Sequence, residues 1–177
     1  MKPRVVLIGA MGAGKTTVGG LLAEAWDVGF RDTDHDVEVV AGRTISDIFV
    51  EDGEAAFRAL ERAAVARALE EHDGVLALGG GAVLDPETQA LLSDHHVVYL
   101  EVGLADASQR VGLGVARPLL LGNVRGRVKQ LLDERAPIYQ RLATITVNTD
   151  GRSADDVAAH VRGAVEEAVE EKDAAHD

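Results

Sequence analysis

Short apolar runs alternate with helical patterns along almost the whole chain. Residues 4–8 form an apolar run that ends at Gly9, and residues 15–26 then place apolar side chains at the spacing of one helix face. Further runs occupy residues 29–33, 75–78, 97–100 and 145–147, and further helical patterns occupy residues 45–50, 54–72 and 86–92 and follow the last two runs. The alternation predicts an α/β fold in three layers, with a five-stranded parallel sheet and helices on both faces.

The pattern has no break that would divide the chain, so residues 1–170 are expected to form one domain. Residues 112–126 lack periodicity and contain four glycines and Pro118, which predicts a mobile lid. Residues 171–177 end an acidic C-terminal stretch and are expected to form a disordered tail.

Composition narrows the classes of function. The 177 residues include no cysteine, which excludes a disulfide framework and thiolate metal sites, and the net charge of -12 argues against nucleic-acid or membrane partners. No apolar run reaches the ~18–20 residues that cross a bilayer, and the first residues lack a signal-peptide layout. We therefore expect a cytoplasmic monomer in which local arginines and backbone N–H groups bind any anionic ligand.

The most specific motif is the segment from Gly9 to Thr16, GAMGAGKT, which matches G-x-x-x-x-G-K-[ST] in full. A predicted strand precedes it and a predicted helix follows it, as a phosphate-binding P-loop requires. In such a loop, backbone N–H groups and the helix N-terminus face the phosphates. Lys15 can reach the β- and γ-phosphates, and the Thr16 hydroxyl can bind Mg²⁺. The motif predicts an ATP site without identifying the reaction.

Two carboxylates, Asp32 and Asp34, follow the second predicted strand in what the pattern indicates is a loop. The carboxyl ends of parallel strands form the ligand-binding edge of an open α/β sheet, so both carboxylates should lie near the phosphates. One could support hydrated Mg²⁺ and the other could accept a hydrogen bond from a substrate hydroxyl. An Asp-x-Asp pair can also form an ordinary turn, and these residues alone leave that alternative open.

Two arginines are candidate receptors for a carboxylate. Arg58 lies on a predicted helix with Glu61 three residues later, so the glutamate can orient the guanidinium group. An ordinary surface ion pair is the alternative. Arg135, in the segment RAPIY that ends a helical stretch, could be a second receptor or a cation at a helix C-terminus.

Glycines and a loop arginine complete the candidate site. Gly79, Gly80 and Gly81 end the third predicted strand, where the backbone is expected to approach a ligand closely, although a strand-end turn would also use glycine. Arg117 begins the segment RPLL in the predicted lid. An arginine on a closing loop can bring positive charge to a transferring phosphoryl group, whereas an exposed arginine would have no such role.

Taken in order, these segments resemble the shikimate kinase family from about residue 4 to residue 155. The resemblance rests on residues 9–17, 32–34, 42–49, 57–58, 79–82, 117–120 and 135–139. It implies a fold of the nucleoside-monophosphate-kinase type with a lid and a substrate-binding helical region at about residues 34–62. The implied reaction converts ATP and shikimate into ADP and shikimate 3-phosphate with Mg²⁺, a step of chorismate and aromatic amino-acid biosynthesis.

The motifs and the resemblance together assign three groups of residues. The residues assigned to nucleotide binding are Gly12, Ala13, Gly14, Lys15, Thr16, Thr17, Arg110, Arg117 and Arg152. The residues assigned to substrate binding are Asp34, Phe49, Phe57, Arg58, Glu61, Gly79, Gly80, Gly81 and Arg135. The metal is assigned to Thr16 and Asp32, and the catalytic roles to Lys15, Asp34 and Arg117.

Three other functions share part of this pattern. A gluconate-type kinase would share the P-loop and lid but has no evident need for the three glycines beside two arginines. In a nucleoside-monophosphate kinase, Asp34 would face a second phosphate unfavourably. A nucleotide-binding switch without turnover would not require Lys15, Asp34 and Arg117 together. Two departures from the family pattern are a segment between Arg117 and Arg135 about one residue shorter than expected and a tail after Val169 without a family motif.

Overall fold

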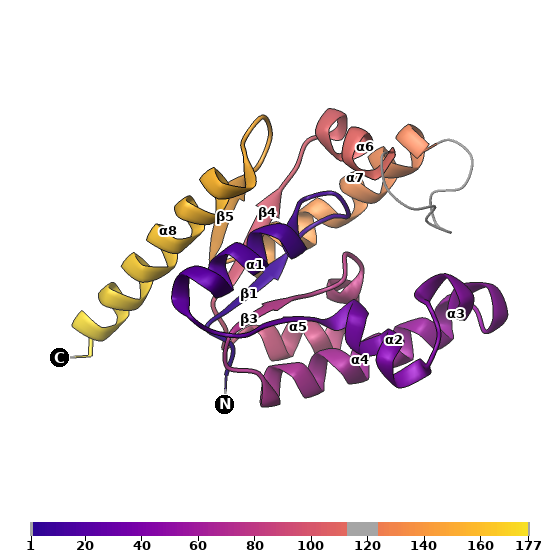
Figure 1. Ribbon diagram of the computed structural model, residues 1–177, viewed down its shortest axis with the longest axis horizontal. Coiled ribbons are helices and arrows are strands. Elements are labelled where there is room, and N and C mark those ends of the chain that lie inside the picture. Colours follow the sequence, from indigo (N-terminus) through magenta and orange to yellow (C-terminus); the bar gives the residue numbers. More distant parts are fainter. Residues whose placement is uncertain (1, 113–123, 177) are drawn as a thin grey trace.

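A single parallel sheet forms the centre of the molecule, as the alternating pattern predicts. The computed structural model describes residues 2–112 and 124–176. Its five strands are all parallel and lie in the order β2-β3-β1-β4-β5 (Figure 1). The strands are β1 (Val5–Ile8), β2 (Phe30–Asp32), β3 (Val75–Ala77), β4 (Val97–Glu101) and β5 (Ile145–Asn148).

The central strand β1 is aliphatic because it is covered on both faces. It pairs with β3 and β4, and Leu7 lies opposite Ala77 on one side and Val98 on the other. All three of these residues are at most 1% exposed. A strand buried on both faces has no solvent-facing side, so it is a continuous apolar run and does not alternate with polar residues.

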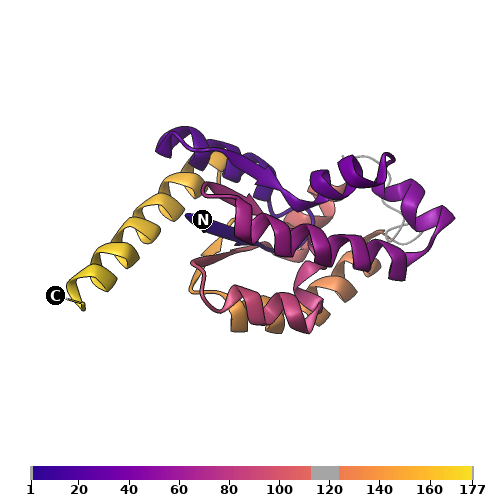
Figure 2. The same cartoon turned by 90° about the horizontal axis from the view of Figure 1, so that it is seen from below.

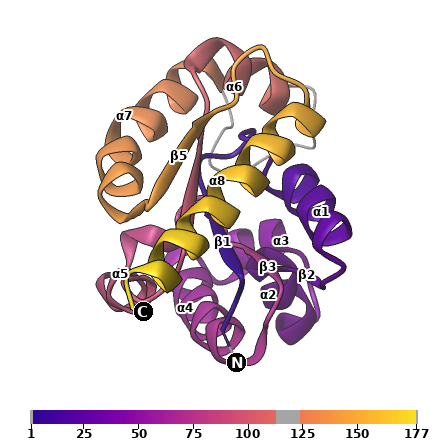
Figure 3. The ribbon, with the colours of Figure 1, turned by 90° about the vertical axis from the view of Figure 1, so that its left-hand side faces the viewer.

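Helices cover both faces of this sheet. They are α1 (Lys15–Trp26), α2 (Thr33–Ala41), α3 (Ile45–Glu51), α4 (Glu54–Glu71), α5 (Pro86–Leu92), α6 (Leu104–Gly112), α7 (Val124–Leu142) and α8 (Ala154–Ala174), with the 3₁₀ turn η1 (Ala82–Leu84). Helices α1 and α8 pack together on one face, and α5 and α7 lie on the other (Figures 2 and 3).

Helices α2 and α3 and the N-terminal part of α4 project from the β2 edge of the sheet (Figure 1). They enclose a small hydrophobic cluster of their own, formed by Val37, Ile48, Phe57 and Ala64, apart from the main core. This projecting unit corresponds to the predicted substrate-binding region at about residues 34–62. Because this projecting unit has its own core, packed helices and not loops position its side chains.

The structure corrects three predictions about local structure. Asp34 lies in the first turn of α2, not in a loop, because the Asp32 side chain caps that helix. Helix α7 continues to Leu142 through Pro137 and does not end at the RAPIY segment, so Arg135 is no C-terminal cation. Residues 171–174, predicted to be disordered, are helical, with Lys172 in the last turn of α8, where a cation is favourable.

Most of the predicted lid, residues 113–123 including Arg117, lies outside the described residues. Within the described part, no helix combines the length and the apolar composition that a bilayer-spanning segment needs.

Candidate active site

The P-loop lies between the end of β1 and the start of α1, as predicted. Gly14 has a φ of +91°, a left-handed conformation that leaves the loop free to turn its N–H groups inward. The Lys15 ammonium donates hydrogen bonds to the Gly9 carbonyl at 2.6 Å and to the Ala10 carbonyl at 3.0 Å. The loop's own backbone therefore fixes this cation over the phosphate-binding concavity.

The two residues predicted to hold Mg²⁺ are neighbours. The Thr16 hydroxyl donates to Asp32 Oδ2 at 3.3 Å, while Asp32 Oδ1 accepts from the Asp34 backbone N–H at 2.9 Å. One carboxylate oxygen thus caps α2 and the other faces the P-loop. The described residues contain no cluster of three or more metal-ligating side chains. Mg²⁺ bound with phosphates needs only one or two protein oxygens, so the Thr16–Asp32 pair fits this ion.

A cleft on the outer side of the P-loop contains the predicted adenine residues. Arg110 donates to the Gly12 carbonyl at 2.9 Å and to the Thr149 carbonyl at 3.2 Å, which links α6 to the P-loop. Arg152 donates to the Asn148 carbonyl at 3.2 Å. Both arginines line this cleft together with Ala13, Gly14, Thr17, Val18, Thr149, Ala154 and Val157. Of the predicted nucleotide residues, the structure thus places Ala13, Gly14, Thr17, Arg110 and Arg152 around one space, while Gly12, Lys15 and Thr16 belong to the adjoining P-loop and the start of α1.

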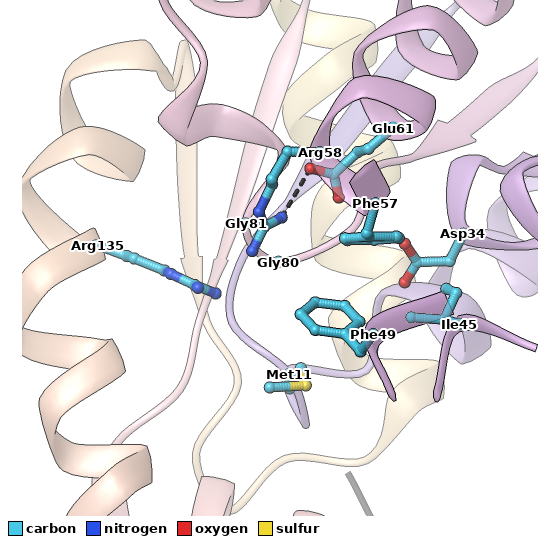
Figure 4. A pocket seen from close by; sticks show the side chains of 10 residues that line it. All are labelled: Met11, Asp34, Ile45, Phe49, Phe57, Arg58, Glu61, Gly80, Gly81 and Arg135. Atoms are coloured by element: carbon cyan, nitrogen blue, oxygen red, sulfur yellow. Dashed lines mark hydrogen bonds and ion pairs between the residues drawn. The ribbon is translucent and has the colours of Figure 1, made fainter. Parts of the chain in front are cut away.

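A second cleft lies on the inner side of the P-loop and collects the predicted substrate residues (Figure 4). It is lined by Met11, Asp34, Ile45, Phe49, Phe57, Arg58, Glu61, Gly80, Gly81 and Arg135. The arginine side chains of α4 and α7 point into it, and Asp34 lies across the cleft from Arg135 (Figure 4). The rings of Phe49 and Phe57, with centroids 4.9 Å apart, form an apolar wall. The cleft therefore combines an apolar wall with arginines and with a carboxylate, Asp34, on the side opposite Arg135.

Arg58 is held as the sequence spacing predicts, and it is not an ordinary surface residue. Its Nη1 donates to Glu61 Oε1 at 2.7 Å, and Nη2 donates to Glu54 at 3.4 Å. The Glu61 side chain is only 5% exposed. Burial raises the pKa of Glu61 above its ordinary value, and the opposing attraction of Arg58 is the second influence. The buried Glu61 carboxylate thus orients the Arg58 guanidinium group.

The glycines at the end of β3 leave room for two of these side chains. A Cβ on Gly79 would lie 2.5 Å from Asp34 Oδ1, and a Cβ on Gly81 would lie 2.5 Å from both terminal nitrogens of Arg58. A Cβ on Gly80 would make ordinary contacts with protein atoms, of which the nearest, Arg135 Nη1 and Met11 N, are 3.5 Å away. Gly80 therefore forms the floor of the cleft itself, which favours the ligand-approach interpretation over a simple turn.

Three residues with evident roles escaped the sequence analysis. Thr33, fully buried between the two aspartates, accepts a hydrogen bond from the Gly79 N–H at 3.2 Å and so ties β2 to the glycine floor. Met11, a variable position of the P-loop motif, and Ile45 complete the apolar wall. The motif spacing gave no sign of Met11, because the residue faces away from the nucleotide side.

Comparisons with known proteins bear on the family and the fold of the chain. The model of the shikimate kinase family matches residues 11–166. A shikimate kinase of Thermobifida fusca is 62% identical over 157 residues, which cover 89% of this chain and 91% of that protein.

Solved structures give the same result. A shikimate kinase from Acinetobacter baumannii in complex with shikimate superposes with a TM-score of 0.90 at 35% identity, covering 94% of both chains. A gluconokinase from Sinorhizobium meliloti reaches a TM-score of 0.59 at 17% identity, with 94% of this chain and 93% of that chain covered. The second likeness shows a shared fold alone.

Proposed function

The chain belongs to the shikimate kinase family and catalyses ATP-dependent phosphorylation of the shikimate 3-hydroxyl, and we propose that its two clefts divide this reaction between them. The outer cleft binds ATP, and the inner cleft binds shikimate. The P-loop separates them, so the γ-phosphoryl group would lie at their boundary. The observation that carries this assignment is the joint presence of Arg58, Arg135 and Asp34 on the walls of the inner cleft.

Shikimate is a ring that carries one carboxylate and three hydroxyls, and the inner cleft has a matching group for each part. The two guanidinium groups receive the carboxylate, since arginine pairs with carboxylates in a planar, bidentate geometry. The ring faces Phe49, Phe57 and Met11 and rests on the Gly80 backbone. Asp34 accepts a hydrogen bond from a ring hydroxyl and orients its oxygen for in-line attack.

On the nucleotide side, Lys15 contacts the β- and γ-phosphates, and Arg110 and Arg152 flank the adenine. The Thr16 hydroxyl and the Asp32 carboxylate would hold Mg²⁺, which supplies charge neutralisation at the phosphates. Arg117, which lies outside the described residues, would add positive charge from a lid over residues 112–126. Positioning and electrostatic stabilisation account for most phosphoryl-transfer catalysis, so these charges matter more than any single base.

ADP release across a panel of acceptors tests this function. We expect turnover with shikimate and background rates with gluconate and AMP. Gluconate is an acyclic chain that carries hydroxyls along its length, and the Phe49–Phe57 wall would leave several of them without partners. Comparable turnover of gluconate would contradict the assignment of the inner cleft.

We also propose that the enzyme works as a cytoplasmic monomer without nucleic-acid or membrane partners. The described residues assigned to each cleft lie close together within the fold of a single chain, and the net charge of -12 disfavours polyanions. Sedimentation of the active enzyme tests the monomer, and a dimer that dissociates with loss of activity would exclude it.

A further inference from the structure

Tyr139 is a buried polar residue behind the inner cleft that none of the roles above includes. It lies on α7, four residues after Arg135, and is 0% exposed. Its ring stacks on Tyr99 of β4 with centroids 5.0 Å apart. Its hydroxyl donates to the Gly80 carbonyl at 2.5 Å. Burial raises the pKa of this hydroxyl to about 12, and the nearby Arg135 guanidinium opposes that rise. One hydroxyl therefore binds the cleft floor at the point where an arginine of the cleft wall approaches it.

The two cleft arginines are held by different kinds of group. Arg58 is oriented by the carboxylates of Glu61 and Glu54, which offset part of its charge. Among the described residues, Arg135 has no carboxylate within ion-pair distance, although it is only 6% exposed. The neutral phenol of Tyr139 beside it does not neutralise its charge, and the Glu61 carboxylate interacts with that charge only at longer range. A buried arginine in this state has most to gain from an arriving carboxylate.

The floor beside Arg135 is also in contact with the P-loop. A Cβ on Gly80 would lie 3.5 Å from Arg135 Nη1 and Met11 N and 3.6 Å from Gly9 O. The Gly80 peptide therefore lies between Arg135 and the loop that binds the phosphates. A group that fixes Gly80 and Arg135 together sets where the substrate carboxylate lies relative to the phosphoryl donor.

We propose that Tyr139 is a positioning residue for shikimate: its hydroxyl fixes the Arg135 guanidinium against the Gly80 floor while leaving the positive charge of Arg135 available to the substrate carboxylate. The proposal rests on the assignment of Arg135 as a carboxylate receptor. Tyr139 itself does not line the cleft, so it acts through Arg135 and Gly80.

Replacing Tyr139 by Phe removes the hydroxyl and keeps the ring stack. The matched control is Tyr99→Phe, which removes the other hydroxyl of the same stacked pair. This control leaves the hydrogen bond to the Gly80 carbonyl in place, because Tyr139 donates it. We expect Tyr139→Phe to raise the Kd of shikimate, measured by calorimetry, about five- to tenfold. The Kd of ATP and the melting temperature should change no more than they do in Tyr99→Phe.

A double-mutant cycle with Arg135→Ala tests the route of the effect. If Tyr139 acts through Arg135, Tyr139→Phe should weaken shikimate binding by less than about twofold once Arg135 is gone. An undiminished effect in the Arg135→Ala background would overturn the proposal, as would equal losses for shikimate and ATP or no loss at all.

These measurements also separate this inference from the function on which it rests. Absence of shikimate binding by the wild-type enzyme, or normal binding by Arg135→Ala, would refute the assignment of the inner cleft. Weakened binding by Arg135→Ala with normal binding by Tyr139→Phe would refute only the role of Tyr139.

Discussion

On the nucleotide side, all groups expected to meet phosphate except Arg117 come from one continuous segment, residues 9–17, whereas the substrate side draws Asp34, Arg58 and Arg135 from three helices. Lys15 is bonded to carbonyls of its own loop. Arg58 is instead positioned by side chains of α4, and Arg135 lies beside the Gly80 floor to which Tyr139 is hydrogen-bonded.

The two sides differ in the contacts that position their functional groups. The nucleotide side depends on local backbone geometry, so replacing its lysine should alter the chemistry and leave the fold unchanged. The substrate side depends on buried polar contacts between distant elements, so its substitutions should affect substrate binding and, in some cases, stability. Four predictions test this contrast, from the largest expected effect to the smallest.

Lys15→Ala should lower kcat about a hundred- to a thousandfold, because the transferring phosphoryl group loses a positioned cation. The melting temperature should stay close to that of the wild type, because Lys15 donates hydrogen bonds to two carbonyls of its own loop and is not part of the hydrophobic core. Lys129→Ala is the control, since Lys129 is an exposed lysine paired with Asp133 at 2.6 Å. A Lys15→Ala enzyme that retains a rate within about threefold of the wild type would refute the assignment of the nucleotide site.

Arg58→Lys should lower kcat/KM for shikimate about 10- to 150-fold with little change in ATP affinity. Lysine keeps the charge but lacks the planar fork, and the loss of a charge-assisted contact costs ~1.5–3 kcal/mol. Arg62→Lys, one turn later on α4 and paired with Asp85 at 2.6 Å, is the matched control. Equal losses for ATP and shikimate would indicate a general defect in folding or in the nucleotide site.

The same contrast explains how much of the site could be predicted from the sequence. The P-loop is a contiguous motif with its strand and helix beside it, so its location and chemistry followed from spacing alone. The Arg58–Glu61 pair was also predictable, because residues three apart share a helix face. The meeting of Arg135 with Gly80 depends on the packing of α7 against β4 and η1, which no local pattern reports.

The errors in local structure have a similar origin. The apolar residues after Asp34 do not share one buried face of α2, because Val37 is buried whereas Val39 and Val40 are exposed. No amphipathic pattern therefore indicated α2, and the Asp32 cap became evident only with the structure. Pro137 suggested a helix end, yet α7 continues past it. Helix α8 packs Val157, Val161 and Val165 into the core, and this packing supports a helix that extends into the acidic stretch.

Gly80→Ala should raise the KM of shikimate about tenfold, because the new methyl group would occupy the cleft floor. The fold should tolerate it, since the nearest protein atoms to a Cβ would be 3.5 Å away. Gly163→Ala on α8, where a Cβ would meet no atom within 4 Å, is the control and should leave the kinetics unchanged. A large fall in melting temperature, or an equal rise in the KM of ATP, would show that Gly80 is structural.

Glu61→Gln should separate stability from function on the substrate side. Burial raises the pKa of Glu61 above its ordinary value of 4.5, so the folded state binds this proton more tightly than the unfolded state does. The resulting stabilisation is fully present below pH 4.5 and is lost as the pH rises through the folded-state pKa. Glutamine has no such titration, so the stability of the wild type relative to Glu61→Gln should fall as the pH increases above 4.5.

The expected size follows from linkage, since one unit of pKa corresponds to about 1.4 kcal/mol. Denaturant unfolding of both proteins across this pH range measures the difference directly. At neutral pH the variant should still bind shikimate several-fold more weakly, because a neutral amide orients Arg58 less firmly than a carboxylate does at 2.7 Å. A stability difference that is constant with pH would show that the Arg58 ion pair fully offsets burial, and one that grows in favour of the wild type would show that the ion pair outweighs burial. The substrate side would then stabilise the fold as well as bind the ligand, and the contrast between the two clefts would disappear.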